Sequence, residues 1–140
     1  MKHVLLSFLI VSFSLQIFAQ IQKEEEIIFC NVEDKPNVVV KLTKTHDKLY
    51  SLYVTNKKTR NAKWQKIMDL DEPVVWTKNG IGEVADFYSL DSYNYWLRLF
   101  FDNNYAASGD GEFLTPRSND PDGTEDPDKF IVNGCKGTLK

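Results

Sequence analysis

Two cysteines stand near opposite ends of an otherwise cysteine-free chain. Cys30 lies in EIIFCNV and Cys135 in KFIVNGC, and both segments are apolar and β-prone. Neither cysteine has a nearby histidine or a Cys-x-x-Cys partner, so a metal ligand or a reactive thiol is the less favoured alternative. The pair predicts one disulfide that joins the first strand to the last. In the chain-entropy model, closing a loop of ~100 residues stabilises the fold by up to about 4.7 kcal/mol.

The start of the chain is typical of an exported protein, in which such a bridge can persist. A short basic start precedes an apolar run from Val4 to Phe18, and Ala19 after it fits a cleavage position. The run is too short to predict a membrane span, and no cysteine follows it where a lipid anchor would require one. We therefore predict a signal peptide at residues 1–19 and a single periplasmic or secreted domain at residues 20–140, without a transmembrane segment.

Apolar and polar residues alternate along most of this domain, which is the pattern of half-buried strands. The strongest strand is YNYWLRLFF, and we expect its core face to hold Tyr93, Tyr95, Leu97, Leu99 and Phe101. DNNY, KNGIG and SGDGE have the composition of turns, whereas TRNAKWQKIMDL fits either a short helix or a strand. The sum predicts an all-β fold, a small antiparallel barrel or sandwich of about seven or eight strands with the first and last disulfide-linked.

The segment NKKTRNAKWQK, residues 56–66, is basic and contains no acidic residue. It is either an anion-binding patch or a solvated connection between two strands. Nucleic acid is not the predicted partner, because the whole chain has a net charge of −3 and such binding needs many phosphate contacts. The candidate partner-binding residues here are Lys57, Lys58, Arg60 and Lys63.

Trp96 and Arg98 lie on the face of YNYWLRLFF opposite the predicted core. An exposed Trp–Arg stripe can stack on a sugar or a protein partner. The same stripe can instead be covered by another strand or by residues 57–70.

The acidic stretch SNDPDGTEDPDKF, residues 118–130, resembles a calcium loop and, over a few residues, the aspartate-rich repeats of thrombospondin type 3 domains. In an EF-hand register with Gly123 at position 6, four ligand positions are filled by Asp120, Asp122, Thr124 and Asp126. Position 12 is Lys129, where the bidentate glutamate should stand. A solvated Pro/Asp/Gly loop before the last strand is the alternative, and calcium is the one cofactor that the sequence suggests.

Catalytic motifs are not apparent in the sequence. Downstream of the signal segment, the only histidine is His46, in a turn, and no nucleophile elbow or zinc-binding motif occurs. A hydrolase with two paired carboxylates remains a third possibility, because spatial pairing is invisible in a sequence. We interpret Asp86, Asp91 and Asp102, near strand ends, as cap and turn residues.

Two short motifs resemble the periplasmic inhibitors of c-type lysozyme, which are small disulfide-closed β-barrels. VWTKNG, residues 75–80, is similar to their Trp-Thr-Lys-Gly segment, and SGDGEF, residues 108–113, to their Ser-Gly-x-x-Tyr loop. The order of the two motifs is reversed here, Glu112 replaces the tyrosine, and Asn79 interrupts the first motif. The resemblance implies partner contacts at Lys78 and Ser108.

Together these features predict an exported binding or inhibitory module that acts on another macromolecule, such as a lytic enzyme or toxin, and that is not an enzyme. The partner is expected to be a protein of the cell envelope or the medium. A calcium- or ligand-binding envelope protein is the alternative function.

Overall fold

The computed structural model describes residues 24–45, 48–77, 82–117 and 126–139, and these ranges fold into nine β-strands. The strands are β1 (Glu25–Val32), β2 (Lys35–Lys44), β3 (Tyr50–Asn56), β4 (Gln65–Leu70), β5 (Val74–Thr77), β6 (Glu83–Tyr88), β7 (Trp96–Phe101), β8 (Ala107–Thr115) and β9 (Asp128–Gly137). The all-β prediction is confirmed. The ambiguous segment at 59–70 ends in a strand, β4, and not in a helix.

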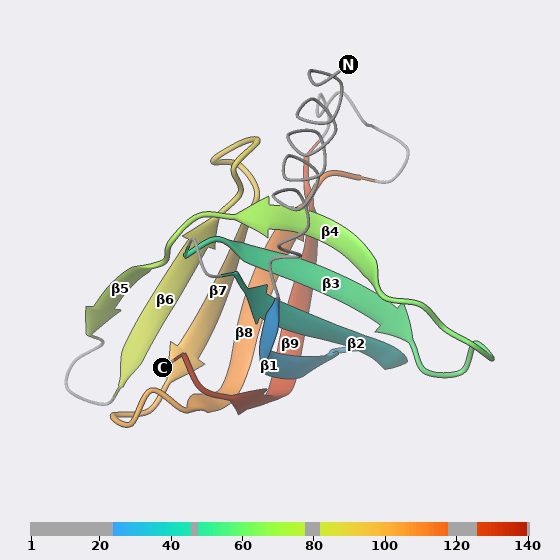
Figure 1. The fold of residues 1–140 in the computed structure, drawn as a ribbon, viewed down its shortest axis with the longest axis horizontal. Coiled ribbons are helices and arrows are strands. Elements are labelled where there is room, and N and C mark those ends of the chain that lie inside the picture. Colours follow the sequence, from blue (N-terminus) through green and yellow to red (C-terminus); the bar gives the residue numbers. More distant parts are fainter. Residues whose placement is uncertain (1–23, 46–47, 78–81, 118–125, 140) are drawn as a thin grey trace, which may run out of the picture.

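All nine strands form one antiparallel sheet with the order β4-β3-β2-β1-β9-β8-β7-β6-β5. The sheet curls strongly, so that β2–β4 pass across β6–β9 (Figure 1). Where the curl brings β4 to the end of β6, Leu70 forms an isolated bridge with Ser89, and the Leu90 N–H donates to the Asp69 carbonyl at 3.0 Å. The molecule is therefore barrel-like, and the end of β4 is hydrogen-bonded to the segment after β6 at this point. β4 and β5 remain the edge strands of the sheet.

The core lies inside the curl, because alternate residues of each strand point to the same face. Tyr50 of β3 meets Phe87 of β6 edge-on, with ring centroids 5.1 Å apart, which shows that the two arms of the sheet pack against each other. The largest fully buried side chains are Phe87, Phe101, Ile28, Leu42, Leu52, Leu70, Leu97 and Leu99.

The predicted disulfide is present between Cys30 and Cys135, with an S–S distance of 2.03 Å. It joins β1 to β9, the first and last strands, which are neighbours in the sheet. Both sulfur-bearing residues belong to the buried core.

Two details of the strand predictions are wrong. Tyr93 is 83% exposed, because β7 begins only at Trp96 and the preceding residues form a turn. SGDGE lies within β8 and is not a turn. Its glycines serve close packing: a Cβ on Gly111 would lie 2.5 Å from the Arg98 carbonyl oxygen on the neighbouring strand β7.

Candidate binding groove

A groove of about 520 Å³ runs across the outer surface of the sheet over β9, β1, β2 and β3. It is open to solvent, since Phe29 inside it remains 38% exposed. We call it the outer groove. Its lining residues are Phe29, Cys30, Asn31, Val39, Thr55, Lys57, Trp64, Gly134 and Lys136.

Strand register builds the floor of the outer groove. Asn31 of β1 pairs with Val39 of β2, and Val39 pairs with Thr55 of β3, so these residues form one row across the sheet. The adjacent row contains Phe29, which pairs with Lys136 of β9. Residues that are far apart in the sequence thus become side-by-side positions on one face.

Trp64, just before β4, forms a wall of the groove. The Lys41 ammonium lies 4.5 Å from the centroid of the Trp64 ring, a cation–π contact, and also forms an ion pair with Glu26. The Lys41 side chain is only 11% exposed, so it holds Trp64 in place and offers little charge to a ligand. Phe29 meets the Trp64 ring at 6.3 Å with an interplanar angle of 59°.

A backbone irregularity keeps the β9 side of the groove open. The pairing of β1 with β9 shifts register between Phe29 and Asn31. Gly134 lies opposite this shift with φ of 56°, a left-handed conformation that favours glycine. A Cβ at this position would lie 3.0 Å from Nδ2 of Asn31, so a side chain here would fill part of the floor.

The two exposed lysines of the groove lining have no ion-pair partner within the described ranges. Among the described residues, no carboxylate forms an ion pair with Lys57 or Lys136. The predicted basic residues do not lie together. Lys57 lines the outer groove, and Lys63 lines a smaller neighbouring cavity of about 240 Å³. Lys58 and Arg60 line neither. Sequence reasoning missed Phe29 and Lys136, because only strand pairing brings them to this segment.

A second aromatic–cation cluster lies on the outer face of β5, β6 and β7, and we call it the tryptophan–arginine ladder. The Arg98 guanidinium lies 5.4 Å from the Trp76 ring centroid and 5.2 Å from that of Trp96. It also donates two hydrogen bonds to Asp86, Nε to Oδ1 at 2.6 Å and Nη2 to Oδ2 at 2.8 Å. The hydrogen bonds to Asp86 raise the pKa of Arg98 further, so its charge is permanent and already paired.

This ladder shows where two predicted residues lie. Trp76 of another strand, β5, contacts Arg98, which also lies against the Trp96 ring. The sequence predicts a cap or turn residue at Asp86, and this prediction is wrong. Asp86 is a buried carboxylate in the middle of β6. Asp102 does belong to a turn, where its Oδ1 accepts from the backbone N–H groups of Asn104 and Ala106.

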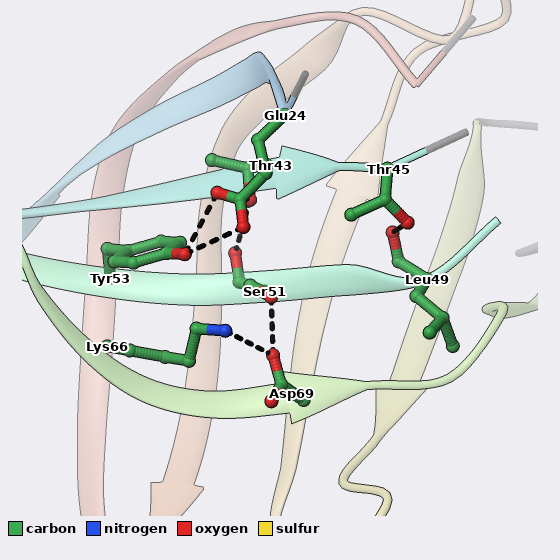
Figure 2. A network of polar contacts seen from close by, with 8 residues as sticks. All are labelled: Glu24, Thr43, Thr45, Leu49, Ser51, Tyr53, Lys66 and Asp69. Carbon is green, nitrogen blue, oxygen red and sulfur yellow. Dashed lines mark hydrogen bonds and ion pairs between the residues drawn. The ribbon is translucent and has the colours of Figure 1, made fainter. Parts of the chain in front are cut away.

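A polar network covers the outer face near the start of β1 (Figure 2). The Ser51 hydroxyl donates to Oδ1 of Asp69 at 2.5 Å, and the Lys66 ammonium lies 2.9 Å from the same oxygen. The Tyr53 hydroxyl donates to both carboxylate oxygens of Glu24 at 2.9 Å.

The protonation equilibria of this network favour structure over acid–base catalysis. Burial would raise the pKa of Asp69, but the hydrogen bonds from Ser51 and Lys66 outweigh it and hold that pKa below its ordinary value. The hydrogen bond to Asp69 raises the pKa of Lys66, and burial with the hydrogen bond to Glu24 raises the pKa of Tyr53. Each group is moved away from neutrality, the opposite of what a general acid or base requires.

The remaining predicted positions lie apart from these clusters. Ser108 is exposed on β8. Lys78, Asp120, Asp122 and Thr124 lie outside the described residues, as do His46 and residues 1–19, and Asp126 is exposed before β9. In the described ranges, no three His, Cys, Asp or Glu side chains are grouped as metal ligands.

Comparison with known proteins does not place the chain in a family. No protein-family model matches it, and neither a curated protein nor a solved structure shows significant similarity to it. In the part of the chain that the structure describes, no helix is long and apolar enough to cross a membrane. The outer groove must therefore be interpreted from its own residues.

Proposed function

We propose that this protein is an exported binding module that holds an anionic segment of another macromolecule in the outer groove. The observation that carries the proposal is the combination of an aromatic wall, Phe29 and Trp64, with two lysines that no described carboxylate neutralises. An unpaired cation beside an apolar surface attracts an anion, and the aromatic rings add apolar contact area.

Export is supported by two features. The Cys30–Cys135 disulfide belongs to a class of bond that persists in oxidising compartments. The first 19 residues have the pattern of a secretory signal. The partner would then be a component of the cell envelope or of the medium.

The shape of the groove supports a macromolecular ligand. Small-molecule sites are usually concave and bury most of their ligand. The outer groove instead extends across four strands and contains an exposed aromatic residue, which suits one segment of a larger chain.

Calorimetric titration with two anionic polymers, poly-L-glutamate and polygalacturonate, tests the proposal. We expect at least one of them to bind, and the affinity to fall as salt screens the attraction. The double variant Lys57→Glu, Lys136→Glu should weaken binding by at least about tenfold, or ~1.4 kcal/mol.

Lys58→Glu is the matched control, because it changes the same charge in the same segment but does not line the groove. It should leave the affinity within about twofold, or ~0.4 kcal/mol. Binding of neither polymer, or equal loss in the control and the double variant, would show that the groove is not the binding surface.

An inhibitory role toward a lytic enzyme is a narrower form of the proposal. Ser108, to which the sequence resemblance points, is exposed and does not line the groove. A lysozyme inhibition assay with Ser108→Trp therefore separates this role from groove binding. If Ser108 contacts the enzyme, this variant should lose inhibition and should still bind the anionic polymer with unchanged affinity.

A further inference from the structure

The spacing of the unpaired lysines indicates what kind of anion the outer groove accommodates. Lys136 lies on β9 and Lys57 follows β3, and these strands are three interstrand steps apart in the sheet. Three steps correspond to roughly 14 Å across the sheet. Lys136 shares a row with Phe29, Lys41 and Tyr53, and Lys57 lies four residues beyond Tyr53, which adds about 13 Å along the strands. The two offsets combine to roughly 20 Å, and since an extended polypeptide advances about 3.3 Å per residue, carboxylates about six residues apart span this distance.

The two aromatic rings of the groove form a wedge and not a flat platform. Phe29 and Trp64 are tilted by 59°, with centroids 6.3 Å apart. A sugar ring stacks best on a single flat aromatic face, and one face of Trp64 is already covered by Lys41. Because the two rings contact each other, a bulky apolar side chain lies over the notch along their edges, where it contacts both rings.

Polar groups on the floor fit the amide groups of a peptide. No described residue hydrogen-bonds to the side-chain amide of Asn31, so it has both a donor and an acceptor to offer. The Thr55 hydroxyl donates to the Lys63 carbonyl at 3.2 Å, which leaves its oxygen able to accept. Gly134 contributes no side chain beside Asn31, so a backbone can approach closely.

We infer that the outer groove takes an extended acidic polypeptide segment in which one bulky apolar side chain lies between two carboxylates. The inference rests on the proposed function and specifies its ligand class. The carboxylates pair with Lys57 and Lys136, the apolar side chain lies against the exposed edges of the Phe29 and Trp64 rings, and the backbone lies over Asn31.

Selection from a random dodecapeptide library displayed on phage tests this inference, with the oxidised protein immobilised. The expected peptides carry Asp or Glu five to seven residues apart, with Phe, Leu or Trp between them. A synthetic copy of one selected peptide is then measured by calorimetry. Its affinity should fall at least about tenfold in the Lys57→Glu, Lys136→Glu protein and by less than about twofold in the Lys58→Glu protein.

A second pair of measurements keeps the failure of this inference distinct from failure of the proposed function. Replacing the apolar residue of the peptide by Ala, or its two acids by Gln and Asn, should each weaken binding severalfold. Selection of peptides without acids, or peptide affinity that survives the double variant, would overturn the inference. Binding of polygalacturonate with no selected peptide would also overturn the inference while leaving the proposed function intact. Binding of neither the polymers nor any peptide would contradict the inference and the proposed function together.

Discussion

The outer groove and the tryptophan–arginine ladder place the same kinds of residue on the outer surface of one sheet. Each combines tryptophan with basic side chains. In the ladder, Arg98 pairs with a carboxylate of the neighbouring strand, Asp86, at 2.6 Å. In the groove, the positions opposite Phe29 are both lysines, Lys41 and Lys136, and the second has no carboxylate partner among the described residues.

The cation that contacts a tryptophan has a carboxylate partner in both clusters, Asp86 for Arg98 and Glu26 for Lys41, and the groove differs by adding lysines without such a partner among the described residues. Asp86 and Arg98 are directly opposite in the register of β6 and β7, so the positive charge of the guanidinium is neutralised within the protein. Lys57 and Lys136, by contrast, have no carboxylate partner in the part of the chain that the structure describes, and we propose that their charge serves a ligand. Substitutions should therefore affect stability in the ladder and binding in the groove.

The largest expected effect comes from the disulfide that lies beneath the groove and joins β1 to β9. The double variant Cys30→Ala, Cys135→Ala should lose about 2 to 5 kcal/mol of unfolding free energy, because the unfolded chain is no longer cross-linked. Guanidinium unfolding measures the loss, and reduced wild-type protein is the parallel sample. Hydrogen exchange should accelerate in β1 and β9 more than in β6 and β7. A loss below about 1 kcal/mol would contradict the assigned role of the bridge.

Arg98→Met should break the ladder. It leaves the Asp86 carboxylate buried without its cation, and we expect a loss of about 2 to 3 kcal/mol, below the ~3–5 kcal/mol of a fully buried pair. Lys57→Met in the groove should change the unfolding free energy by less than about 0.5 kcal/mol, as exposed charges usually do. Urea unfolding of both variants gives the comparison, and equal losses would remove the distinction between the two clusters.

Gly134→Ala should affect both properties in the groove. The left-handed φ of 56° disfavours a side chain, so stability should fall by about 1 kcal/mol. The added methyl group also occupies the floor beside Asn31, and binding of anionic ligands should weaken severalfold. Thermal unfolding and calorimetry measure the two effects. Unchanged binding in a folded variant would place the ligand elsewhere.

The smallest effect concerns Asp69, which pairs with Lys66 near the groove. Its pKa is lowered in the folded state, so it contributes stability above the ordinary aspartate value of 3.8, and this contribution disappears as pH falls through the folded pKa. The wild type should exceed Asp69→Asn by a constant amount, under about 1 kcal/mol, between pH 7 and 5. Urea unfolding should show the gap closing below pH 4. A gap that widens in acid would reverse the sign of the linkage.

Much of the fold follows from local pattern. The alternation of apolar and polar residues at 37–44 and 48–55 predicts the buried faces of β2 and β3, since Leu42 and Leu52 lie in the core as the period of two requires. The disulfide follows from there being only two cysteines. The glycines of SGDGE predict a turn, because glycine is typical of turns, whereas the close approach of β7 is what requires Gly111.

The candidate site was only partly predictable for a topological reason. Lys57 was visible within a basic run, but Lys136 joins it only because the curled sheet places β9 beside β1. Trp96 and Arg98 were visible as a stripe, yet their role depends on Asp86, whose position opposite Arg98 is a matter of register. A one-residue change in the register of β6 would place the Asp86 side chain on the other face of the sheet.

The most direct test uses the three tryptophans of the chain as reporters, since Trp64 belongs to the groove while Trp76 and Trp96 belong to the ladder. The indole N–H signals of ¹⁵N-labelled protein are followed during titration with poly-L-glutamate and with the selected peptide. The account predicts that the Trp64 signal moves and saturates with either ligand that binds, while the Trp76 and Trp96 signals stay in place. Movement of the ladder signals with a stationary Trp64 would contradict it.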